Sequence, residues 1–453
     1  MMASTMAAPT TLPSRHRAIL YEAQNVTLRS GTGIATYARA LALAAARLGY
    51  RVDGLVSVER GLARGQGRLN DVLAFDAVDE HQRPTLLEVA LRYLGYPFNA
   101  LGGLRPIELP RSGLVFGPMA DALQPFHRVF ATTQLVDISA AHFTIYGGLA
   151  QLRLPDRPAL FHATQPIPLA VKGCPNIYTI HDLVPLRLPY TTPVNKKYFY
   201  RLLTSLARTA DHIVTVSEFS RRDIIEHLGV DERRVTNTYQ AVNIQAEVLA
   251  RSDAEVADEL AKFFGLEFGG YFLFCGAIEP KKNVSRLVDA YAASGSKLPL
   301  ILAGSAGWHN RADLRKIRDE RFINFQIDGN TIRRERQVRR LEYLPRDQLF
   351  SLVRGARAML FPSIYEGFGL PVIEAMALGT PVVTSNVSSL PEIAGDAALL
   401  VDPYSIGDIS RAIRTIEADA DLRTHLACRG REQAQKFSPQ AYDERLKRVY
   451  DAL

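Results

Sequence analysis

Short β-rich segments alternate with longer segments of helical hydrophobic periodicity, a pattern typical of parallel sheets joined by crossover helices. A first series of strands is predicted at residues 17–23, 51–58, 176–180 and 212–216. A helix is predicted at 34–48, and Ser217 suits the N-cap of another helix, whose solvated face would carry Arg221, Arg222 and Asp223. Between residues 59 and 158 the pattern is poor, apart from an apolar helical stretch at 85–94.

A second series of strands starts afresh later in the chain, at residues 271–276, 298–303, 358–362 and 381–385. An acidic helical segment at 252–264 separates the two series. We therefore predict an α/β protein with two doubly wound domains, residues 18–245 and 246–437, facing each other across a cleft. Residues 1–17 are predicted to be a disordered leader. Residues 438–453 are predicted to be a capped helix that packs back on the first domain.

The composition is that of a globular protein, with 453 residues of which 47% are hydrophobic and 22% charged. The net charge of +7 lies in the first 220 residues, where basic side chains exceed acidic ones by 11 to 8 in residues 1–100 and by 11 to 7 in residues 101–220. This excess of positive charge either is incidental or marks a surface that binds an anionic membrane, a phosphorylated substrate or nucleic acid. Nucleic acid is disfavoured because the basic residues are not interleaved with aromatic stacking platforms.

The three cysteines, Cys174, Cys275 and Cys428, are too few and too scattered for a disulfide framework or a thiolate zinc site. A reducing compartment is therefore expected. The first 17 residues lack the features of a signal peptide, and no run approaches the roughly 18 to 20 apolar residues that a membrane span needs. We expect a cytoplasmic protein whose contact with the inner face of the membrane is peripheral.

The stretch 362–378, PSIYEGFGLPVIEAMAL, predicts a loop followed by a short helix that begins at Pro371 and is capped by Gly379. Free backbone N–H groups and the positive end of the dipole at that helix start suit a phosphate. Glu366 in the loop and Glu374 in the first helical turn would be repelled by a diphosphate. Both carboxylates are therefore better suited to accept hydrogen bonds from sugar hydroxyls.

A second stretch, 274–283 (FCGAIEPKKN), predicts a strand that ends at a glycine turn and presents Lys281 and Lys282 before a helix at 284–293. These ammonium groups could neutralise a diphosphate without a metal ion. Asp419 and Asp421 form a D-x-D string, but they lie in a polar helical segment and are expected to be solvated rather than to bind a metal.

With these motifs the sequence resembles the retaining nucleotide-sugar glycosyltransferases of family 4, which have the GT-B fold of two Rossmann-like domains facing across a cleft. The resemblance is close over residues 271–403, through G-x-I-E-P-x-K-N, F-P-S-x-Y-E-G-F-G-L-P-V-x-E-A-M-A and S-S-L-P-E-I-A-G-D-A-A-L-L-V-D-P. It is looser at GTGIATY (31–37), HDLVP (181–185) and VSEFSRR (216–222). The strings E-P-K-K-N and H-D-L are closest to bacterial mannosyltransferases that build O-antigen and exopolysaccharide repeat units.

The resemblance implies that Glu366 meets the hydroxyls of the donor sugar, that Glu374 holds the ribose, and that Lys282, aided by Lys281, contacts the diphosphate. His181 is expected to donate a hydrogen bond on the sugar side or the acceptor side. The implied catalytic residues are Glu366, Lys282 and His181. The other implied donor-binding residues are Gly33, Gly367, Phe368, Gly369, Leu370, Tyr343 and Leu344.

Two positions depart from the family pattern. Ala277 stands where many members have an arginine, so the charge of the leaving group must rest on the lysines and on helix dipoles. Glu342 stands where relatives often have a glycine, close to the expected base contacts. The basic block 311–340, with 10 basic and 5 acidic side chains, is longer than expected and is interpreted as a surface insertion.

The implied activity is transfer of a hexose, with mannose from GDP-mannose as first choice, to a glycan or polyprenyl-diphosphate-linked saccharide in surface polysaccharide assembly. UDP-glucose or UDP-N-acetylglucosamine as donor, and a sugar-binding protein without turnover, are the alternatives. Retention is expected by front-face attack, with no metal or other cofactor. An oxidoreductase is disfavoured because Gly31-x-Gly33 lacks the third glycine of the dinucleotide fingerprint, where Thr36 stands instead.

Overall fold

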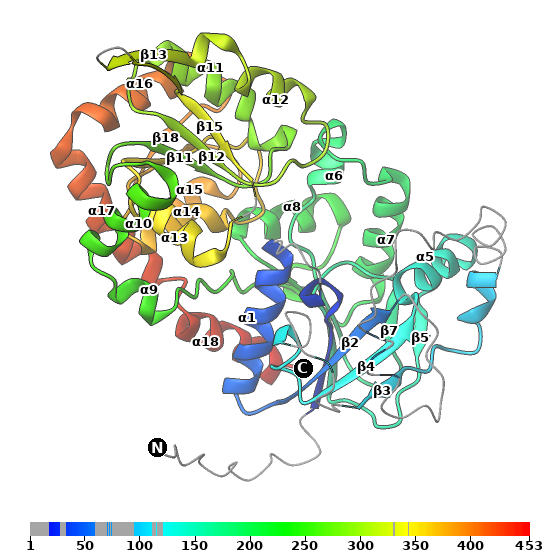
Figure 1. Cartoon of the computed structure of the whole chain (residues 1–453). Helices are drawn as coiled ribbons and strands as arrows, with labels where there is room; N and C mark the ends of the chain where they lie inside the picture. The colour runs from blue at the N-terminus through cyan, green and yellow to red at the C-terminus, as the bar shows by residue number, and fades with distance from the viewer. Residues whose placement is uncertain are drawn as a thin grey trace, which may run out of the picture.

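The computed structural model describes residues 18–27, 33–58, 70, 72, 74, 95–110, 115, 121–328, 331–342 and 344–453. The predicted leader at 1–17, the apolar stretch at 85–94 and Tyr343 therefore lie outside the described residues. The described chain forms two α/β halves, each built on its own mainly parallel sheet (Figure 1). The predicted strands are all present, within one or two residues of their expected limits.

The first sheet has eight strands in the order β10-β9-β8-β6-β1-β2-β4-β3, all parallel except β3, which runs antiparallel to β4. Its strands are β1 (Ala18–Glu22), β2 (Arg51–Val58), β3 (Ile107–Leu109), β4 (Arg128–Thr133), β6 (Leu160–Ala163), β8 (Asn176–Thr179), β9 (His212–Thr215) and β10 (Val235–Asn237). Every residue of β1 is buried, as expected for a central strand of a parallel sheet that is covered on both faces. The chain continues from β1 to one side and later resumes at β6 on the other, so the topological switch point lies between these strands.

The second sheet has six strands in the order β15-β12-β11-β16-β17-β18, all parallel. Its strands are β11 (Phe272–Cys275), β12 (Leu300–Ala303), β15 (Val338–Leu341), β16 (Ala358–Phe361), β17 (Val382–Ser385) and β18 (Ala398–Val401). The chain runs outward from β11 in one direction and from β16 in the other. The switch point of this sheet therefore lies between β11 and β16, and ligands of such sheets bind beyond the carboxyl ends of the strands at this point.

Helices flank both sheets. In the first half they are α1 (Gly33–Arg47), α5 (Leu135–Tyr146), α6 (Val184–Arg187), α7 (Lys196–Thr209) and α8 (Glu218–Leu228). In the second half they are α9 (Ala246–Ala250), α10 (Asp253–Phe264), α11 (Val284–Ser294), α12 (Arg311–Ile317), α13 (Arg346–Arg354), α14 (Leu370–Ala377), α15 (Leu390–Ala394), α16 (Ile406–Ala418) and α17 (Ala420–Gln435). The last helix is α18 (Pro439–Asp451).

Two small sheets complete the fold. β5 (Ala150–Leu152) pairs with β7 (Leu169–Val171) in the first half. In the basic block, β13 (Ile323–Asp328) and β14 (Thr331–Arg336) form an antiparallel hairpin. This hairpin is a sheet of its own and adds no strand to the six-stranded sheet.

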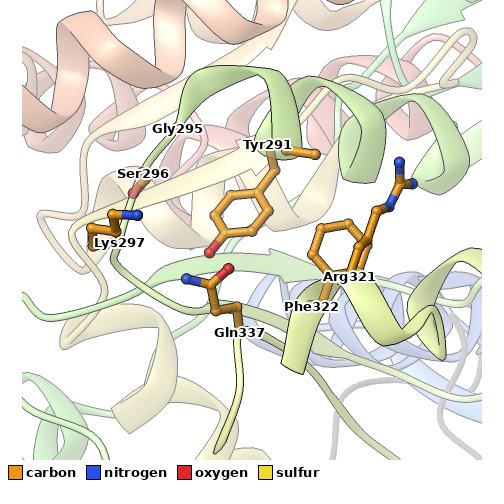
Figure 2. Close-up of a pocket in the computed structure, with 8 residues that line it drawn as sticks. Tyr291, Gly295, Ser296, Lys297, Arg321, Phe322 and Gln337 are labelled. Carbon is orange, nitrogen blue, oxygen red and sulfur yellow. The ribbon is translucent and has the colours of Figure 1, made fainter. Parts of the chain in front are cut away.

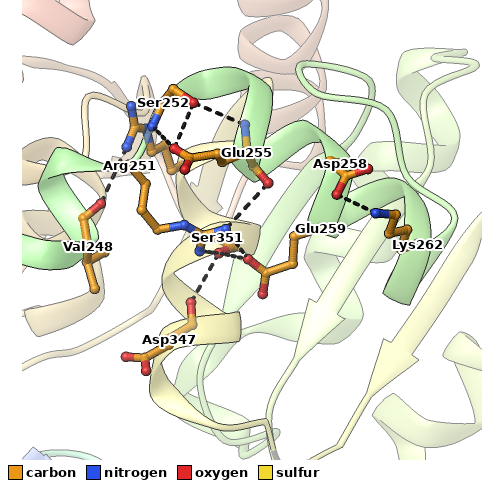
Figure 3. Close-up of polar contacts among 10 residues, drawn as sticks. Val248, Arg251, Ser252, Glu255, Asp258, Glu259, Lys262, Asp347 and Ser351 are labelled. Carbon is orange, nitrogen blue, oxygen red and sulfur yellow. Dashed lines mark hydrogen bonds and ion pairs between the residues drawn. The ribbon is translucent and has the colours of Figure 1, made fainter.

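The start of α10 is fixed by a capping box next to α13 (Figure 3). The Ser252 hydroxyl accepts a hydrogen bond from the Glu255 backbone N–H at 3.2 Å, and the Glu255 carboxylate accepts one from the Ser252 N–H at 2.7 Å. On α13, Ser351 accepts a hydrogen bond from Arg251 at 2.7 Å and donates one to Glu259 at 2.9 Å. The capping box and the contacts of Ser351 together fix the position at which α10 begins.

The final helix α18 is anchored to the first half by a buried polar cluster. The Tyr450 hydroxyl lies 2.7 Å from the Tyr21 hydroxyl and 2.7 Å from His162 Nδ1, and His162 Nε2 lies 2.9 Å from the Thr179 hydroxyl. Burial lowers the pKa of His162 to about 3, so its ring is neutral, with one nitrogen donating and the other accepting a hydrogen bond. The chain crosses between the halves twice, near Val242 and near Phe437. The two crossings lie side by side, since the Val242 N–H donates a hydrogen bond to the Phe437 carbonyl at 2.9 Å.

Replacing Tyr450 with phenylalanine should lower the free energy of unfolding by about 1–3 kcal/mol, because two buried polar partners lose their hydrogen bond. Urea denaturation followed by circular dichroism measures this change. Tyr404→Phe is the matched control, since Tyr404 is 55% exposed, and it should change stability by less than about 0.5 kcal/mol. Equal effects of the two substitutions would contradict the anchoring role of Tyr450.

Candidate active site

A cluster of paired charges lies at the switch point of the second sheet. Lys282 follows β11 and Glu366 follows β16, and the two neighbouring strands bring Lys282 Nζ within 2.6 Å of Glu366 Oε1. Lys281 Nζ lies 3.9 Å from Glu366 Oε2 and 3.7 Å from Glu279 Oε1. Three residues that the sequence analysis assigned to the site, Lys281, Lys282 and Glu366, are therefore brought together.

Backbone contacts fix the two loops that carry these charges. Lys281 and Lys282 lie on a short 3-10 helix, Pro280–Lys282, and the next residue, Asn283, adopts a left-handed conformation with φ of 62°. The Asn283 side-chain amide donates to the carbonyls of Pro362 and Pro403 at 2.9 and 2.7 Å. The Ile364 N–H donates to the Lys281 carbonyl at 2.8 Å. The lysine loop and the glutamate loop therefore form one hydrogen-bonded unit.

The charges in this cluster are largely removed from solvent, and they control one another's ionisation. Burial alone would raise the pKa of the Glu366 carboxyl, but the ammonium groups of Lys282 and Lys281 outweigh burial and hold that pKa below its usual value. Burial would lower the pKa of Lys281, but Glu366, Asp182 and Glu279 outweigh it and raise that pKa. Glu366 is therefore a carboxylate at neutral pH, close to two cationic side chains.

The loop between Glu366 and α14 is held by two serines that the sequence analysis did not single out. The Ser389 hydroxyl contacts the carbonyls of Glu366 and Phe368, each at 2.9 Å, and the Ser388 hydroxyl accepts a hydrogen bond from the Glu366 N–H at 3.1 Å. The sequence feature that could have identified these serines is the S-S-L-P-E string, which is part of the family pattern. Gly369 caps α14 with φ of 105°, a conformation that favours glycine.

Glu374 lies beyond the first turn of α14, contrary to the prediction, because the helix begins at Leu370 rather than at Pro371. Its side chain is 15% exposed, and Oε1 lies 3.5 Å from Arg346 of α13 instead of joining the lysine cluster. Burial raises the pKa of Glu374 to about 7, although Arg346 opposes the shift. The carboxyl therefore changes its charge near neutral pH.

The first half packs tightly against the glutamate loop at Gly367. A Cβ atom at Gly367 would lie 2.6 Å from the His181 carbonyl oxygen and 3.0 Å from the Asp182 Cβ, so no larger residue fits without movement. The Ser220 hydroxyl at the start of α8 also contacts the Gly367 carbonyl at 3.3 Å. Glycine at this position therefore allows the two halves to meet beside the charge cluster.

His181 is placed at this junction, but its hydrogen-bonding role differs from the expected one. Its Nε2 lies 2.9 Å from the Thr164 carbonyl oxygen, which can only accept, so Nε2 carries the proton. Burial lowers the pKa of His181, although the Thr164 carbonyl and Asp182 oppose this, so the ring is neutral and Nδ1 is an acceptor. We predicted that His181 donates a hydrogen bond to a substrate, whereas in this structure the N–H of its ring donates to the Thr164 carbonyl.

Asp223 is buried and does not lie on the solvated face where we had placed it. The Tyr365 hydroxyl, from the second half, donates a hydrogen bond to the Asp223 carboxylate. The Tyr365 ring also packs against Phe219, with ring centroids 5.4 Å apart. The prediction was wrong because the covering side chain comes from the other half of the molecule.

The remaining predicted donor-binding residues are more dispersed. Gly33 begins α1 and is exposed, and a Cβ atom there would meet nothing within 4 Å. The Phe368 ring packs against Phe437 with centroids 5.5 Å apart, so its side chain belongs to the core. Leu370 begins α14 and is half-buried.

The predicted base-binding segment is only partly described. Leu344 is half-buried against the core of the second half, and Tyr343 lies outside the described residues. Glu342, the departure from the family glycine, is 78% exposed and lies 3.4 Å from Arg340.

Other features of the surface lie away from the charge cluster. A hollow of about 180 Å³ beside α11 is lined by Tyr291, Lys297, Arg321, Phe322 and Gln337, none of which we predicted to be a site residue (Figure 2). Asp419 caps α17 by accepting a hydrogen bond from the Leu422 N–H at 2.8 Å. In the described part of the chain, no group of three or more His, Cys, Asp or Glu side chains is arranged to hold a metal ion. Within the same residues, no helix is both long and apolar enough to cross a membrane.

Comparisons with known families agree with this arrangement. A model of group 1 glycosyl transferases matches residues 268–433, and a model of glycosyltransferase family 4 matches residues 122–246. The first match includes the charge cluster and the second includes His181. Together the two models cover more than half of the chain.

Individual relatives are similar over part of their length. The chain is 36% identical over 267 residues to O-antigen chain mannosyltransferase B of Escherichia coli, which is 58% of this chain and 66% of that protein. It is 29% identical over 264 residues to the serotype-specific mannosyltransferase WbdA of Escherichia coli, which is 57% of this chain and 31% of that protein. The match to O-antigen chain mannosyltransferase RfbU of Salmonella typhimurium is 27% over 239 residues, 53% of this chain and 60% of that protein. The chain thus spans less than two thirds of the length of these relatives.

Solved structures share the fold at low sequence identity. Anabaena HepE in complex with UDP and glucose has a TM-score of 0.65 and 16% identity, over 97% of this chain and all of that one. WaaG, a glycosyltransferase involved in lipopolysaccharide biosynthesis, has a TM-score of 0.57 and 13% identity, over 96% of this chain and 99% of that one. These likenesses confirm the predicted GT-B fold. With two family models matched and a relative at 36% identity, the chain belongs to the family 4 glycosyltransferases.

Proposed function

We propose that this chain is a retaining hexosyltransferase that moves mannose from GDP-mannose to a glycan or a polyprenyl-diphosphate-linked saccharide during assembly of a surface polysaccharide. The observation that carries the proposal is the Lys282–Glu366 pair at the switch point of the second sheet, with a helix start beside it. The names of the Escherichia coli and Salmonella relatives support mannose as the sugar and O-antigen as the product class. We place the reaction in the cytoplasm, at the inner face of the membrane.

In this proposal the protein stabilises charge and positions two substrates. Lys282 and Lys281, with the positive end of the α14 dipole, lower the energy of the negative charge that grows on the departing diphosphate. The ionised Glu366 carboxylate accepts hydrogen bonds from sugar hydroxyls and orients the ring. The acceptor oxygen bonds to the anomeric carbon on the face that the diphosphate leaves, and the departing phosphate takes the acceptor's proton. His181 Nδ1, an unprotonated nitrogen, would accept a hydrogen bond from a substrate hydroxyl.

Two alternatives concern the donor and turnover. UDP-glucose or UDP-N-acetylglucosamine could replace GDP-mannose, and a sugar-binding protein would hold a donor without transferring its sugar. Incubation of the purified protein with each labelled donor and a bacterial lipid extract separates these cases. Transfer from GDP-mannose alone supports the proposal, and transfer from a UDP-sugar alone would correct the donor. Absence of both transfer and hydrolysis with every donor would sink the enzymatic proposal.

Lys282→Met should lower kcat/KM for sugar transfer by about 30-fold or more, because a charge-assisted contact of roughly 2 kcal/mol to the leaving group is lost. Lys262→Met is the matched control, since Lys262 is an exposed lysine of α10 paired with Asp258, and it should leave the rate within about two-fold. Thermal denaturation checks that both variants are folded. A wild-type rate in folded Lys282→Met would refute the assignment.

The affinity for GDP should depend on the charge of Glu374. Because the pKa of this carboxyl is raised to about 7, its ionised fraction grows roughly ten-fold between pH 6 and pH 8. An ionised carboxylate is the stronger acceptor for ribose hydroxyls, so binding should be tighter at pH 8 by up to about ten-fold. Isothermal calorimetry of GDP binding to wild type and to Glu374→Gln, at pH 6 and pH 8, tests this. Protonation of GDP itself affects both proteins equally. The same pH dependence in both proteins would argue against a ribose contact.

We propose that transfer needs no metal ion, because Lys281 and Lys282 supply positive charge where the diphosphate would lie. Treatment with excess EDTA should leave the transfer rate unchanged, in a radiometric assay run with and without added Mg²⁺. Complete loss of activity that Mg²⁺ restores would overturn the proposal.

A further inference from the structure

A group of exposed apolar side chains lies on the outer flank of the first half. Phe98 is 64% exposed, Leu101 58%, Ile145 62% and Tyr146 45%, and we call these four residues the flank patch. Phe98 belongs to a short helical segment at residues 95–99, and Ile145 and Tyr146 end α5. Large apolar side chains exposed together on a soluble domain indicate a contact surface.

His142 joins the two segments of the flank patch. Its Nδ1 lies 3.2 Å from the Pro97 carbonyl oxygen, and its ring centroid lies 5.0 Å from that of Tyr146. The residue before Phe98 and the end of α5 therefore contact the same side chain. The patch is thus a feature of the tertiary structure, built from segments about 45 residues apart in the sequence.

Helix α7 extends this surface beside α5 (Figure 1). The Phe143 ring of α5 lies 5.8 Å from Tyr198 of α7, and the Arg201 guanidinium lies 5.8 Å from the same Phe143 ring. Lys197 and Arg201 are exposed and four residues apart, so they share one face of α7. Tyr200, between them, is 51% exposed. Basic and aromatic side chains therefore adjoin the flank patch on this side.

The three described segments that form or adjoin the flank patch carry charged residues of one sign only. The segments 97–105, 143–154 and 196–201 contain no Asp or Glu, and their charged residues are Arg105, Arg153, Lys196, Lys197 and Arg201. The Arg153 side chain lies against Gly103, where a Cβ atom would meet its Nε at 2.7 Å, so a cation also borders the patch from this side. In the chain as a whole, 54 basic residues face 47 acidic ones, so this uniform sign is a local property.

We propose that the flank patch docks the first half on an anionic phospholipid surface. Apolar and aromatic side chains would enter the boundary between headgroups and acyl chains, while Lys197, Arg201 and Arg153 would contact the anionic headgroups. The inference rests on the proposed function only in that a lipid-linked acceptor would be presented at such a surface. The basic side chains of these segments favour an anionic lipid over a second copy of the chain, whose own patch would bring like charges together.

The test is co-sedimentation of the whole protein with vesicles of phosphatidylglycerol and phosphatidylcholine, compared with phosphatidylcholine alone, at low and high salt. We expect binding to the anionic vesicles at low salt and its loss at high salt. K197E/R201E should weaken this binding about ten-fold or more, because two favourable charges become repulsive. F98S/I145S should weaken it by a similar factor, because the inserted apolar area is lost.

Matched controls come from the second half. K297E/R318E changes the net charge by the same amount as K197E/R201E at exposed positions, and F263S removes an apolar side chain that is 67% exposed. Both should retain wild-type vesicle binding. Circular dichroism and transfer to a soluble acceptor verify that every variant is folded, since none of these residues belongs to the candidate active site.

The outcomes separate this proposal from the proposed function. Equal binding to neutral and anionic vesicles, or equal weakening by patch and control variants, would overturn the docking proposal and leave the transfer assay untouched. A flank-patch variant that changes the oligomeric state in light scattering, without changing vesicle binding, would show that a second copy covers the patch and would also overturn it. Vesicle binding lost only in the patch variants supports the proposal even if no donor is ever transferred.

Discussion

The buried ion pair between Lys282 and Glu366 is the interaction on which the geometry of the candidate active site depends. Two charges taken out of water cost several kcal/mol unless they are paired and hydrogen-bonded, and removing one partner leaves the other uncompensated. The glutamate loop must therefore stay where its carboxylate meets the ammonium group, and Ser388, Ser389 and Asn283 hold its backbone there. The positive charges are thus arranged before any diphosphate is present, so little reorganisation accompanies binding.

The alternation of short strands and helices, which is a local signal, was enough to predict two α/β domains and the main strands of each sheet. Proline and glycine likewise placed the loop before α14. Strand order is not a local property, because hydrophobic periodicity does not say that β11 lies beside β16. The contact between Lys282 and Glu366 joins residues 84 positions apart; the two motifs had been paired as parts of one site, but the ion pair itself was not predicted.

The error at Asp223 arises from a contact between the two halves. Asp223 follows two arginines and has the local setting of a solvated residue, yet Tyr365 from the second half covers it. The close approach of Gly367 to His181 likewise leaves no trace in the periodicity of either segment. Glu374 was misplaced for a smaller reason, since Leu370 starts the helix one residue earlier than the proline suggests. Short strands such as β3 and β4 lay in the stretch, residues 59–158, whose pattern was too poor to interpret.

The cluster of Tyr21, His162 and Tyr450 has a consequence for the order in which the protein can fold. Tyr21 and Tyr450 are 429 positions apart, so a ribosome completes the entire second half before it makes the side chain that the first half still lacks. Domains usually fold as units during synthesis, from the N-terminus onward. Here the domain that emerges first is finished last, when α18 arrives, and a truncated nascent chain would leave His162 Nδ1 without the Tyr450 hydroxyl.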